Sequence, residues 1–306
     1  MLIREICELK HEYYRRTGNR LHILNPKSFN EKLQWLKLFY KDYKIVICSD
    51  KLWVKKYLSK KGYSENIPKT LSVYNDADEI SLDNLPSECV IKTSHGSGSV
   101  IMYNAHDAEY IFNIRKKLRN WLKKPYMECT KEWQYNIVKP RIFAESCLKN
   151  EMEERLVDYK YMCFNGKCEL IFLVLNRERK RDMYVDFYDT EWNKLPFSRA
   201  YNCSNKVFSK PKQFEKMKMI AEDLAKEFPF LRVDFYIVED KVYIGELTFF
   251  PGSGWELFDP SSYDYYYGKM LKLPDIFQCI QKYKQLKRFL KQIKNNKWEG
   301  LELWEL

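Results

Sequence analysis

Residues that break regular structure are scarce in this chain, and long apolar runs are absent. Of its 306 residues only 10 are glycine and 11 are proline, whereas 45% are hydrophobic and 16% are aromatic. This composition excludes a disordered, linker-rich or collagen-like chain and leaves enough apolar material for a folded core. Because no window approaches about 18 consecutive uncharged apolar residues, the sequence predicts no membrane-spanning helix.

Signals of export and of zinc binding are also missing. Arg4 interrupts the first residues, which therefore lack the apolar core of a signal peptide. The 9 cysteines are scattered without a Cys-x-x-Cys pair, and only 4 histidines could join them in a zinc site. No Ser-His-Asp or Cys-His arrangement stands out as a nucleophilic centre. We therefore expect reduced thiols and a cytoplasmic protein.

Acidic residues are in the minority, and the excess of positive charge is concentrated near the C-terminus. The chain has 53 Lys and Arg against 42 Asp and Glu, a net charge of +11. This balance indicates an anionic partner, which could be phosphate, nucleic acid, anionic lipid or an acidic sugar. Residues 276–298 contain no acid, and their basic side chains are Lys282, Lys284, Lys287, Arg288, Lys291, Lys294 and Lys297.

The same C-terminal segment has apolar residues at helical spacing. They are Phe277, Ile280, Tyr283, Leu286, Phe289, Leu290 and Ile293. A basic amphipathic helix of this kind suits the surface of an anionic membrane. A helix that packs on the body of the protein and leaves its lysines in solvent explains the pattern as well, and the narrow apolar stripe slightly favours this packed helix.

The period of the apolar residues changes along the chain and predicts an α+β fold. Residues 1–60 are mostly helical in pattern, and residues 108–123 and 214–228 each predict an amphipathic helix. From about residue 140 the period shortens to two, which is typical of strands, and Asn165-Gly166 marks a tight turn. The expected strands cover residues 141–148, 156–164 and 169–175, and two more follow residue 228.

A lysine and a loop of small residues join two predicted strands. Lys92 ends the first strand, residues 93–98 form the loop, and the second strand starts at Ser99. Glycine and serine let backbone N–H groups approach a phosphate closely, while the lysine supplies positive charge. The loop is not a P-loop, because no Gly-Lys-Ser/Thr occurs and no helix follows. An ordinary hairpin turn with an edge lysine explains the pattern equally well.

A later hairpin is predicted to bring two carboxylates together. The acidic turn at residues 239–241 predicts a three-residue loop between two strands. Pairing Val238 with Val242 then places Asp234 opposite Glu246 on the same face. Carboxylates directly opposite each other are roughly 5 Å apart and repel unless a cation lies between them.

The same pairing places Arg232 opposite Thr248, beside the two carboxylates. Hard oxygen ligands of this kind suit Mg²⁺, completed by phosphate oxygens and water. The alternative is a solvated strand face on which Arg232 neutralises Asp234. A further stretch, Glu145-x-x-Leu148, offers backbone groups to an adenine edge, but taken alone it indicates structure only.

The order of these elements resembles the ATP-grasp superfamily, the fold of carboxylate–amine ligases. In that family a lysine of an Asp-Lys motif and a strand lysine contact the nucleotide phosphates, and a glycine-rich loop covers them. A Glu-x-x-Leu hinge holds adenine, and a late Asp…Glu-x-Asn set binds magnesium. This chain has Asp50-Lys51 before a predicted helix, followed by the other elements in the same order. Thr248 stands where most members have asparagine, and a threonine hydroxyl is a poorer Mg²⁺ ligand.

The resemblance implies a role for each matching residue. The nucleotide would be bound by Lys51, Lys92, His95, Gly96, Ser97, Gly98, Ser99, Glu145, Ser146, Cys147, Leu148 and Asp158, the last at the ribose. Magnesium would be bound by Asp234, Glu246 and Thr248. Lys92, Lys160 and Arg232 would be the catalytic cations.

Within the superfamily the chain is most similar to the TupA-like branch, which occurs in teichuronopeptide and in capsular or O-antigen polysaccharide synthesis. The matching motifs span roughly residues 25–270 and are residues 29–35, 158–166, 185–189 and 245–254. The implied ATP-grasp fold holds the nucleotide between two α+β subdomains. We expect helical residues 1–48, subdomains at 49–140 and 141–270, and a basic C-terminal helix and tail at 271–306.

The resemblance implies an ATP- and Mg²⁺-dependent ligase that forms an amide through an acyl phosphate. It would attach an amino acid or amine to a uronic acid of a glycan or lipid-linked sugar. We expect no nucleic-acid partner and a cytoplasmic location, with attachment to the inner membrane face left open. One alternative is a nucleotide-sugar glycosyltransferase with metal on Asp76-Ala-Asp78, although Asn and Asp are ordinary turn formers there. A non-catalytic basic module is the other alternative, and it leaves the Lys92 loop unexplained.

Overall fold

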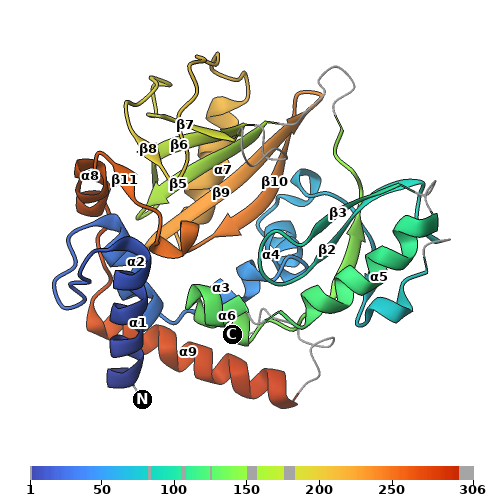
Figure 1. The fold of residues 1–306 in the computed structure, drawn as a ribbon, viewed down its shortest axis with the longest axis horizontal. Coiled ribbons are helices and arrows are strands. Elements are labelled where there is room, and N and C mark those ends of the chain that lie inside the picture. The colour runs from blue at the N-terminus through green and yellow to red at the C-terminus, as the bar shows by residue number, and fades with distance from the viewer. Residues whose placement is uncertain are drawn as a thin grey trace.

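The computed structural model describes residues 2–81, 84–104, 108–124, 126–149, 157–175 and 183–295. Within them the chain has the expected α+β fold, with two antiparallel sheets side by side and helices below them (Figure 1). Leu156 and residues 296–298, which the sequence assigned to a strand and a helix, lie outside the described residues.

The N-terminal part is helical, as the sequence predicts. Its helices are α1 (Leu2–Thr17), α2 (Phe29–Phe39), α3 (Tyr43–Ser49) and α4 (Trp53–Lys60), with the turn η1 (Ser64–Asn66). A capping box begins α2: Glu31 N donates to Ser28 Oγ at 3.2 Å, and Ser28 N donates to Glu31 Oε2 at 3.1 Å. Asp50 accepts hydrogen bonds from the N–H groups of Leu52 and Trp53 at the start of α4.

The first sheet carries the Lys92 strand. Its order is β1 (Thr70–Tyr74), β4 (Ile142–Glu145), β2 (Glu88–Thr93) and β3 (Val100–Asn104), with α5 (Ala108–Leu122) against β2. The turn η2 (Ala77–Glu79) precedes β2, and α6 (Tyr126–Thr130) and η4 (Trp133–Asn136) precede β4. We had expected the second subdomain to begin at residue 141, but β4 belongs to the first sheet, because its backbone pairs with β1 and β2.

The second sheet carries the expected carboxylate hairpin. Its order is β10 (Lys241–Thr248), β9 (Phe230–Val238), β5 (Asp158–Phe164), β6 (Lys167–Leu175) and β7 (Tyr184–Tyr188). Helix α7 (Phe214–Ala225) packs on β5, β6 and β9. A small sheet pairs β8 (Ser198–Arg199) with β11 (Phe258–Asp259), and η6 (Pro251–Gly254), α8 (Ser262–Met270) and α9 (Ile276–Asn295) complete the described chain.

The β9–β10 hairpin pairs Asp234 with Glu246 as expected, but its loop length differs from the prediction. Val238 pairs with Lys241 and not with Val242, so the loop has two residues, both with positive φ (48° and 62°). Such φ values are those of a type I′ turn. A bulge between Ile244 and Glu246 then shifts the register by one residue. The shift restores the predicted alignment of the two carboxylates.

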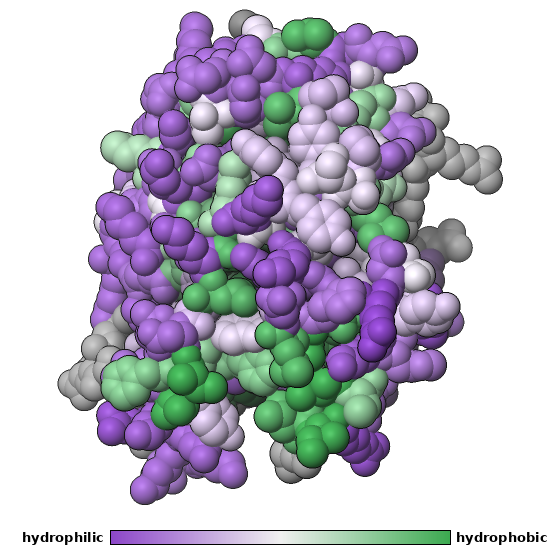
Figure 2. All heavy atoms as spheres, turned by 90° about the vertical axis from the view of Figure 1, so that its left-hand side faces the viewer, coloured by the Kyte–Doolittle hydropathy of each residue, from purple (hydrophilic) through white to green (hydrophobic). Residues whose placement is uncertain are grey.

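The C-terminal helix α9 packs on the body with one face, as the packed-helix interpretation predicted. Cys279, Leu286 and Phe289 are buried, and Lys282 Nζ lies 2.6 Å from Asp42 Oδ2. Figure 2 shows one face of the molecule. Apolar side chains gather toward the lower end of this face, while most of the rest is hydrophilic. None of the described helices is long and apolar enough to cross a bilayer.

Candidate active site at the facing sheets

Glu145 forms ion pairs with two lysines beside the first sheet. Lys92 on β2 forms an ion pair with Glu145 Oε1, and Lys55 Nζ on α4 lies 2.7 Å from Oε2. Burial opposes ionisation of this carboxyl, but the two lysines outweigh burial and hold the pKa of Glu145 below its usual value. Each carboxylate oxygen therefore positions one cation at the end of this sheet.

Lys51 connects this cluster to the second sheet. Asp50 fixes the start of α4 and pairs with Arg141 at 2.9 Å, which holds the backbone next to Lys51. The Lys51 ammonium donates to the carbonyl oxygen of Gly96. Its pKa is lowered chiefly by burial and further by Lys92, against the attraction of Glu246 on β10. Residues of both sheets thus act electrostatically on one half-buried lysine.

The loop of small residues after Lys92 is held in place by an aromatic side chain. Gly96 and Gly98 have φ of 70° and 77°, which other residues rarely adopt. The ring of Tyr126 lies against Gly96 so closely that a Cβ there would clash, and the Tyr126 hydroxyl donates to Ser97 O. Burial, assisted by Lys51, lowers the pKa of His95 to about 4, so this side chain adds no positive charge at neutral pH.

The second sheet contributes a compact charge network. Arg232 Nε and Nη2 donate to Asp234 Oδ1 and Oδ2 at 2.6 and 2.8 Å. Lys160, directly opposite Asp234 on β5, also pairs with Asp234, and its Nζ lies 2.8 Å from Asp158 Oδ2. Despite burial, Arg232 and Lys160 hold the pKa of Asp234 below its usual value. Arg232 neutralises Asp234, as the alternative interpretation of this strand face predicted, and Lys160 adds a second cation, so Asp234 does not face Glu246 uncompensated.

The oxygen atoms around Glu246 fit a divalent cation. Glu246 lies opposite Asp234 in the ladder, and among the described residues it forms no hydrogen bond or ion pair. The Thr248 hydroxyl is buried and finds no hydrogen-bond partner within the described chain. No group of three or more His, Cys, Asp or Glu residues gathers there or elsewhere in the described ranges. A hydrated ion completed by phosphate oxygens fits this donor set better than a site closed by protein ligands alone.

The stretch expected to contact adenine, residues 145–148, begins at the last residue of β4 and continues directly after it. The Ser146 N–H donates to Lys69 O at 2.9 Å, and Ser146 Oγ accepts from Lys69 N at 3.1 Å, so this residue is fixed to the strand-entry loop. Cys147 and Leu148 are half-buried and continue the edge next to Glu145. The hinge residues leave the sheet beside the start of β2, because Glu145 pairs with Val90, whereas the loop after Thr93 leaves it at the opposite end, beside Ile142. The Lys92–Glu145 ion pair connects the two groups of predicted nucleotide residues.

Sequence reasoning missed three polar residues around the site, of which Lys37 and Glu132 are buried and Lys55 is half-buried. Lys55 stands four residues after Lys51, a helical spacing that could have indicated a shared face. Lys37 on α2 donates to Ser253 O at 2.6 Å and Thr130 O at 2.9 Å. Glu132 accepts from Ser253 Oγ at 2.7 Å, and burial raises its pKa. These contacts fix η6, the loop that follows Thr248, against the N-terminal helices.

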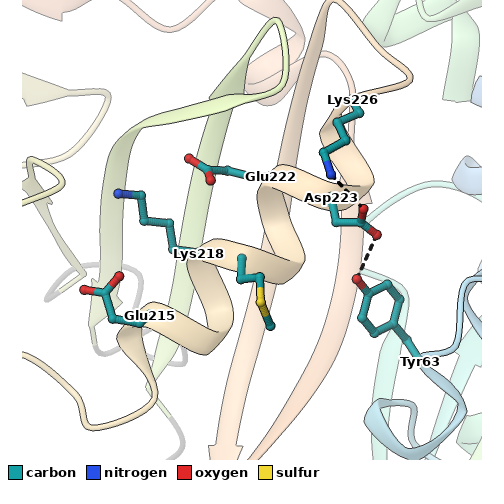
Figure 3. Close-up of a pocket in the computed structure, with 7 residues that line it drawn as sticks. Tyr63, Glu215, Lys218, Glu222, Asp223 and Lys226 are labelled. Atoms are coloured by element: carbon teal, nitrogen blue, oxygen red, sulfur yellow. Dashed lines mark hydrogen bonds and ion pairs between the residues drawn. The ribbon is translucent and has the colours of Figure 1, made fainter.

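Two other candidate locations do not form part of this site. Asp76 caps η2 by accepting from Asp78 N at 2.9 Å, and Asp78 pairs with Arg119, so Asp76-Ala-Asp78 is a turn. A pocket of about 630 Å³ lies on the outer face of α7 beside Tyr63 (Figure 3). Its polar lining includes Asp223, which accepts from Tyr63 Oη at 2.8 Å, and none of the candidate site residues lines it.

Comparison with known proteins decides between the interpretations of this geometry. A model of the TupA-like ATPgrasp family matches residues 31–272. The chain belongs to this family. Membership confirms the expected superfamily and branch, and the coarse function that follows for this TupA-like ATP-grasp protein is that of an ATP-dependent carboxylate–amine ligase.

Solved structures resemble the TupA-like protein only distantly. D-alanine–D-alanine ligase from Bacillus anthracis complexed with ATP has a TM-score of 0.47 and 15% identity, over 84% of this chain and 75% of that chain. The ligase from Helicobacter pylori has 0.42 and 16%, over 84% and 69%. The ATP-grasp ligase PsnB complexed with minimal precursor has 0.38 and 12%, over 67% and 53%. No curated protein matches the chain, and we transfer no residue role from these structures.

Proposed function

We propose that the protein uses ATP to activate a sugar carboxylate and joins it to an amine during polysaccharide synthesis. We call the N-terminal helices with the first sheet the first lobe, and the second sheet with its helices the second lobe. The observation that carries this proposal is that Lys51 of the first lobe contacts the loop of small residues and interacts electrostatically both with Lys92 and with Glu246 of the second lobe. Such an arrangement of cations suits a polyphosphate whose far end reaches a second group of charged residues.

The first lobe would bind the nucleotide. Lys51 and Lys92 would contact the phosphates, and the N–H groups of residues 95–99 would cover them. Residues 145–148 would meet the adenine edge, and Asp158 would accept from ribose hydroxyls. Because Lys51 now donates to Gly96 O and Lys92 pairs with Glu145, phosphate oxygens would replace or share these contacts.

Mg²⁺ fits at the second lobe, where it would neutralise phosphate charge. Glu246 and Thr248 would hold it, with Asp234 contributing what lone pairs Arg232 and Lys160 leave free. Threonine stands where most ATP-grasp members have asparagine and is a poorer Mg²⁺ ligand, so any second ion would be held weakly.

The reaction we propose has two steps. A carboxylate oxygen of the sugar attacks the γ-phosphorus of ATP, the bond to the β-phosphate oxygen breaks, and ADP leaves an acyl phosphate. An uncharged amine then attacks the carbonyl carbon, phosphate leaves with the bonding electrons, and the amine loses a proton to form the amide. Lys160 and Arg232 would stabilise the charge on the phosphoryl oxygens, and Lys92 would hold the nucleotide phosphates. Asp158 positions Lys160, and Asp234 positions Arg232, before any substrate binds.

The proposed acceptor is a uronic acid of a glycan precursor, and the proposed amine is that of an amino acid. The acidic sugar agrees with the excess of positive charge, +11 over the chain. Where the precursor is lipid-linked, the protein would work at the inner face of the membrane. Asp76 and Asp78 do not support the alternative of a nucleotide-sugar glycosyltransferase, because Asp76 caps a turn and Asp78 pairs with Arg119.

A nucleotide screen by thermal unfolding tests the proposal. A ligand that binds only the native state raises the free energy of unfolding, by about 2.7 kcal/mol at one hundred times its Kd. The unfolding temperature rises with it. We expect stabilisation by ATP or ADP with Mg²⁺ and none by UDP-sugars. Stabilisation by UDP-sugars alone would refute the ligase. ADP release that depends on both a uronic acid glycan and an amine would then identify the substrates.

A further inference from the structure

The outward face of α9 is divided into an apolar part and a basic part. The inner face is the packed one, formed by Cys279, Leu286 and Phe289. On the opposite side, the first two turns expose four large apolar side chains. They are Ile276 (75% exposed), Phe277 (65%), Ile280 (47%) and Tyr283 (47%).

The later turns of the same outward face are basic. Lys284, Lys287, Arg288, Lys291 and Lys294 are all exposed. Along the described helix there is no acidic residue, and no described carboxylate forms an ion pair with any of these five. Among the described residues, Lys282 is the one lysine of α9 with an acidic partner, and its Nζ lies 2.6 Å from Asp42 Oδ2 on the inner side.

The first turn of α1 is exposed and apolar as well. Leu2 and Ile3 lie in its first turn with their side chains in solvent. Figure 1 places α1 and the first turns of α9 at the same lower end of the molecule, and Figure 2 shows apolar side chains gathered at that end. Single exposed apolar residues are ordinary on a protein surface, whereas a cluster beside cations that have no acidic partner among the described residues indicates an interaction surface.

We propose that the outward face of α9 binds an anionic lipid bilayer. The apolar first turns would enter the headgroup region, and the basic turns would lie against the lipid phosphates. The cations and the exposed apolar side chains together favour a bilayer over a second copy of the chain or a nucleic acid. A second copy of the chain would bring another row of cations to the same face, and a nucleic acid would leave the four apolar side chains without a favourable contact. The proposal is independent of the ligase reaction.

Binding of the full chain to vesicles of defined composition tests the proposal. We expect flotation with vesicles that contain phosphatidylglycerol, none with phosphatidylcholine alone, and loss of binding as salt screens the surface. Lys287→Gln with Lys291→Gln should weaken partitioning by about fivefold for each charge removed. Phe277→Ser with Ile280→Ser should weaken it on the same vesicles at low salt.

Matched controls separate this face from a general surface effect. Lys212→Gln with Lys216→Gln removes the same charge from exposed positions at α7, and Val207→Ser with Met219→Ser removes exposed apolar side chains elsewhere. Both controls should bind vesicles like the original chain. Every variant should keep its unfolding temperature and its response to nucleotide, because none lies in the proposed site.

Four results would overturn the proposal. Equal binding by the α9 variants and the controls would show that another surface binds. No binding to anionic vesicles at low salt would exclude the membrane. A dimer that Phe277→Ser with Ile280→Ser dissociates, seen by light scattering, would assign the face to a second copy. Binding that appears only after residues 296–306 are removed would assign it to the chain's own C-terminus, which carries Glu299, Glu302 and Glu305.

Discussion

At the scale of single residues, the pairing of each lysine determines what its loss would do. Lys92 shares Glu145 with Lys55, so the carboxylate keeps a partner when Lys92 is removed. A buried charge that loses every partner costs far more than one that loses one of two. The cations of the first lobe can therefore be tested singly without destroying the fold.

Lys92→Ala should weaken nucleotide binding while the protein stays folded. A hydrogen bond to a charged group contributes about 1.5–3 kcal/mol, so the Kd for ADP should rise roughly 10- to 100-fold. Isothermal titration calorimetry measures this change. The control is Lys226→Ala, which removes the ion pair of an exposed lysine with Asp223 and should leave the Kd unchanged. An unaltered ADP affinity in folded Lys92→Ala would exclude the phosphate role.

Glu246→Gln and Asp234→Asn should differ strongly in their effect on stability and have the same effect on turnover. Glu246 forms no hydrogen bond or ion pair with the described residues, so its neutralisation should change the free energy of unfolding by less than about 1 kcal/mol. Asp234→Asn leaves Arg232 and Lys160 poorly compensated and should cost about 3–5 kcal/mol. Urea unfolding without nucleotide compares the two variants.

Activity completes this comparison. Both substitutions should nearly abolish ADP formation, because each removes an oxygen ligand proposed for Mg²⁺. Full activity in Glu246→Gln, together with a large loss of stability, would instead make this residue part of a structural network.

His95 should make the protein less stable in mild acid. Burial lowers its pKa from 6.5 to about 4 in the folded state, so the unfolded state binds more protons between these values. Stability from this residue is therefore complete above pH 6.5 and falls as the pH falls toward 4, by up to roughly 3 kcal/mol. His95→Gln should flatten the pH dependence of the unfolding free energy between pH 4.5 and 6.5. An unchanged slope would show that His95 does not titrate this way.

At the scale of elements, the β9–β10 hairpin shows how a bulge aligns the site. A two-residue turn alone would offset Glu246 from Asp234, and the irregularity beside Gly245 corrects the offset. A Cβ at Gly245 would lie 2.6 Å from the Tyr236 ring, so a larger residue in the bulge would force this ring to move.

Gly245→Ala should therefore destabilise the hairpin by about 1–3 kcal/mol through overpacking. Truncation of the neighbouring ring should relieve the clash, so Gly245→Ala with Tyr236→Ala should lose less than the sum of the single changes. A double-mutant cycle by urea unfolding measures this coupling. Strict additivity would mean that the ring and the new methyl group do not meet.

At the scale of the whole molecule, the C-terminal helix supports the N-terminal helices that carry Lys51. Phe289 of α9 is fully buried and lies 5.5 Å from the Tyr43 ring and 6.1 Å from the Trp53 ring, measured between centroids. Trp53 begins α4, two residues after Lys51. Residues from the two ends of the chain thus form one layer beneath the candidate site.

Phe289→Ala should cost about 3–5 kcal/mol of stability, because it opens a cavity in this layer. Phe277→Ala on the same helix is the matched control and should change stability by no more than about 0.5 kcal/mol, since its side chain is exposed. Chemical denaturation compares the two. Equal effects would contradict the division of α9 into a packed and an outward face.

The sequence by itself determined the α+β class, the family resemblance and the order of the site residues. These features follow from local patterns: the period of apolar residues, turn residues such as Asn165-Gly166, and motifs read along the chain. Even the alignment of Asp234 with Glu246 was predicted correctly, although from a wrong turn length.

Only the tertiary structure decided which charges meet. The pairing of Glu145 with Lys55, of Asp234 with Lys160, and of Ser253 with Glu132 joins residues far apart in the chain. Their partners depend on how the sheets and helices pack, and a local pattern contains no information on that packing. For the same reason only the structure could separate the packed and outward faces of α9, whose apolar stripe along the chain is continuous.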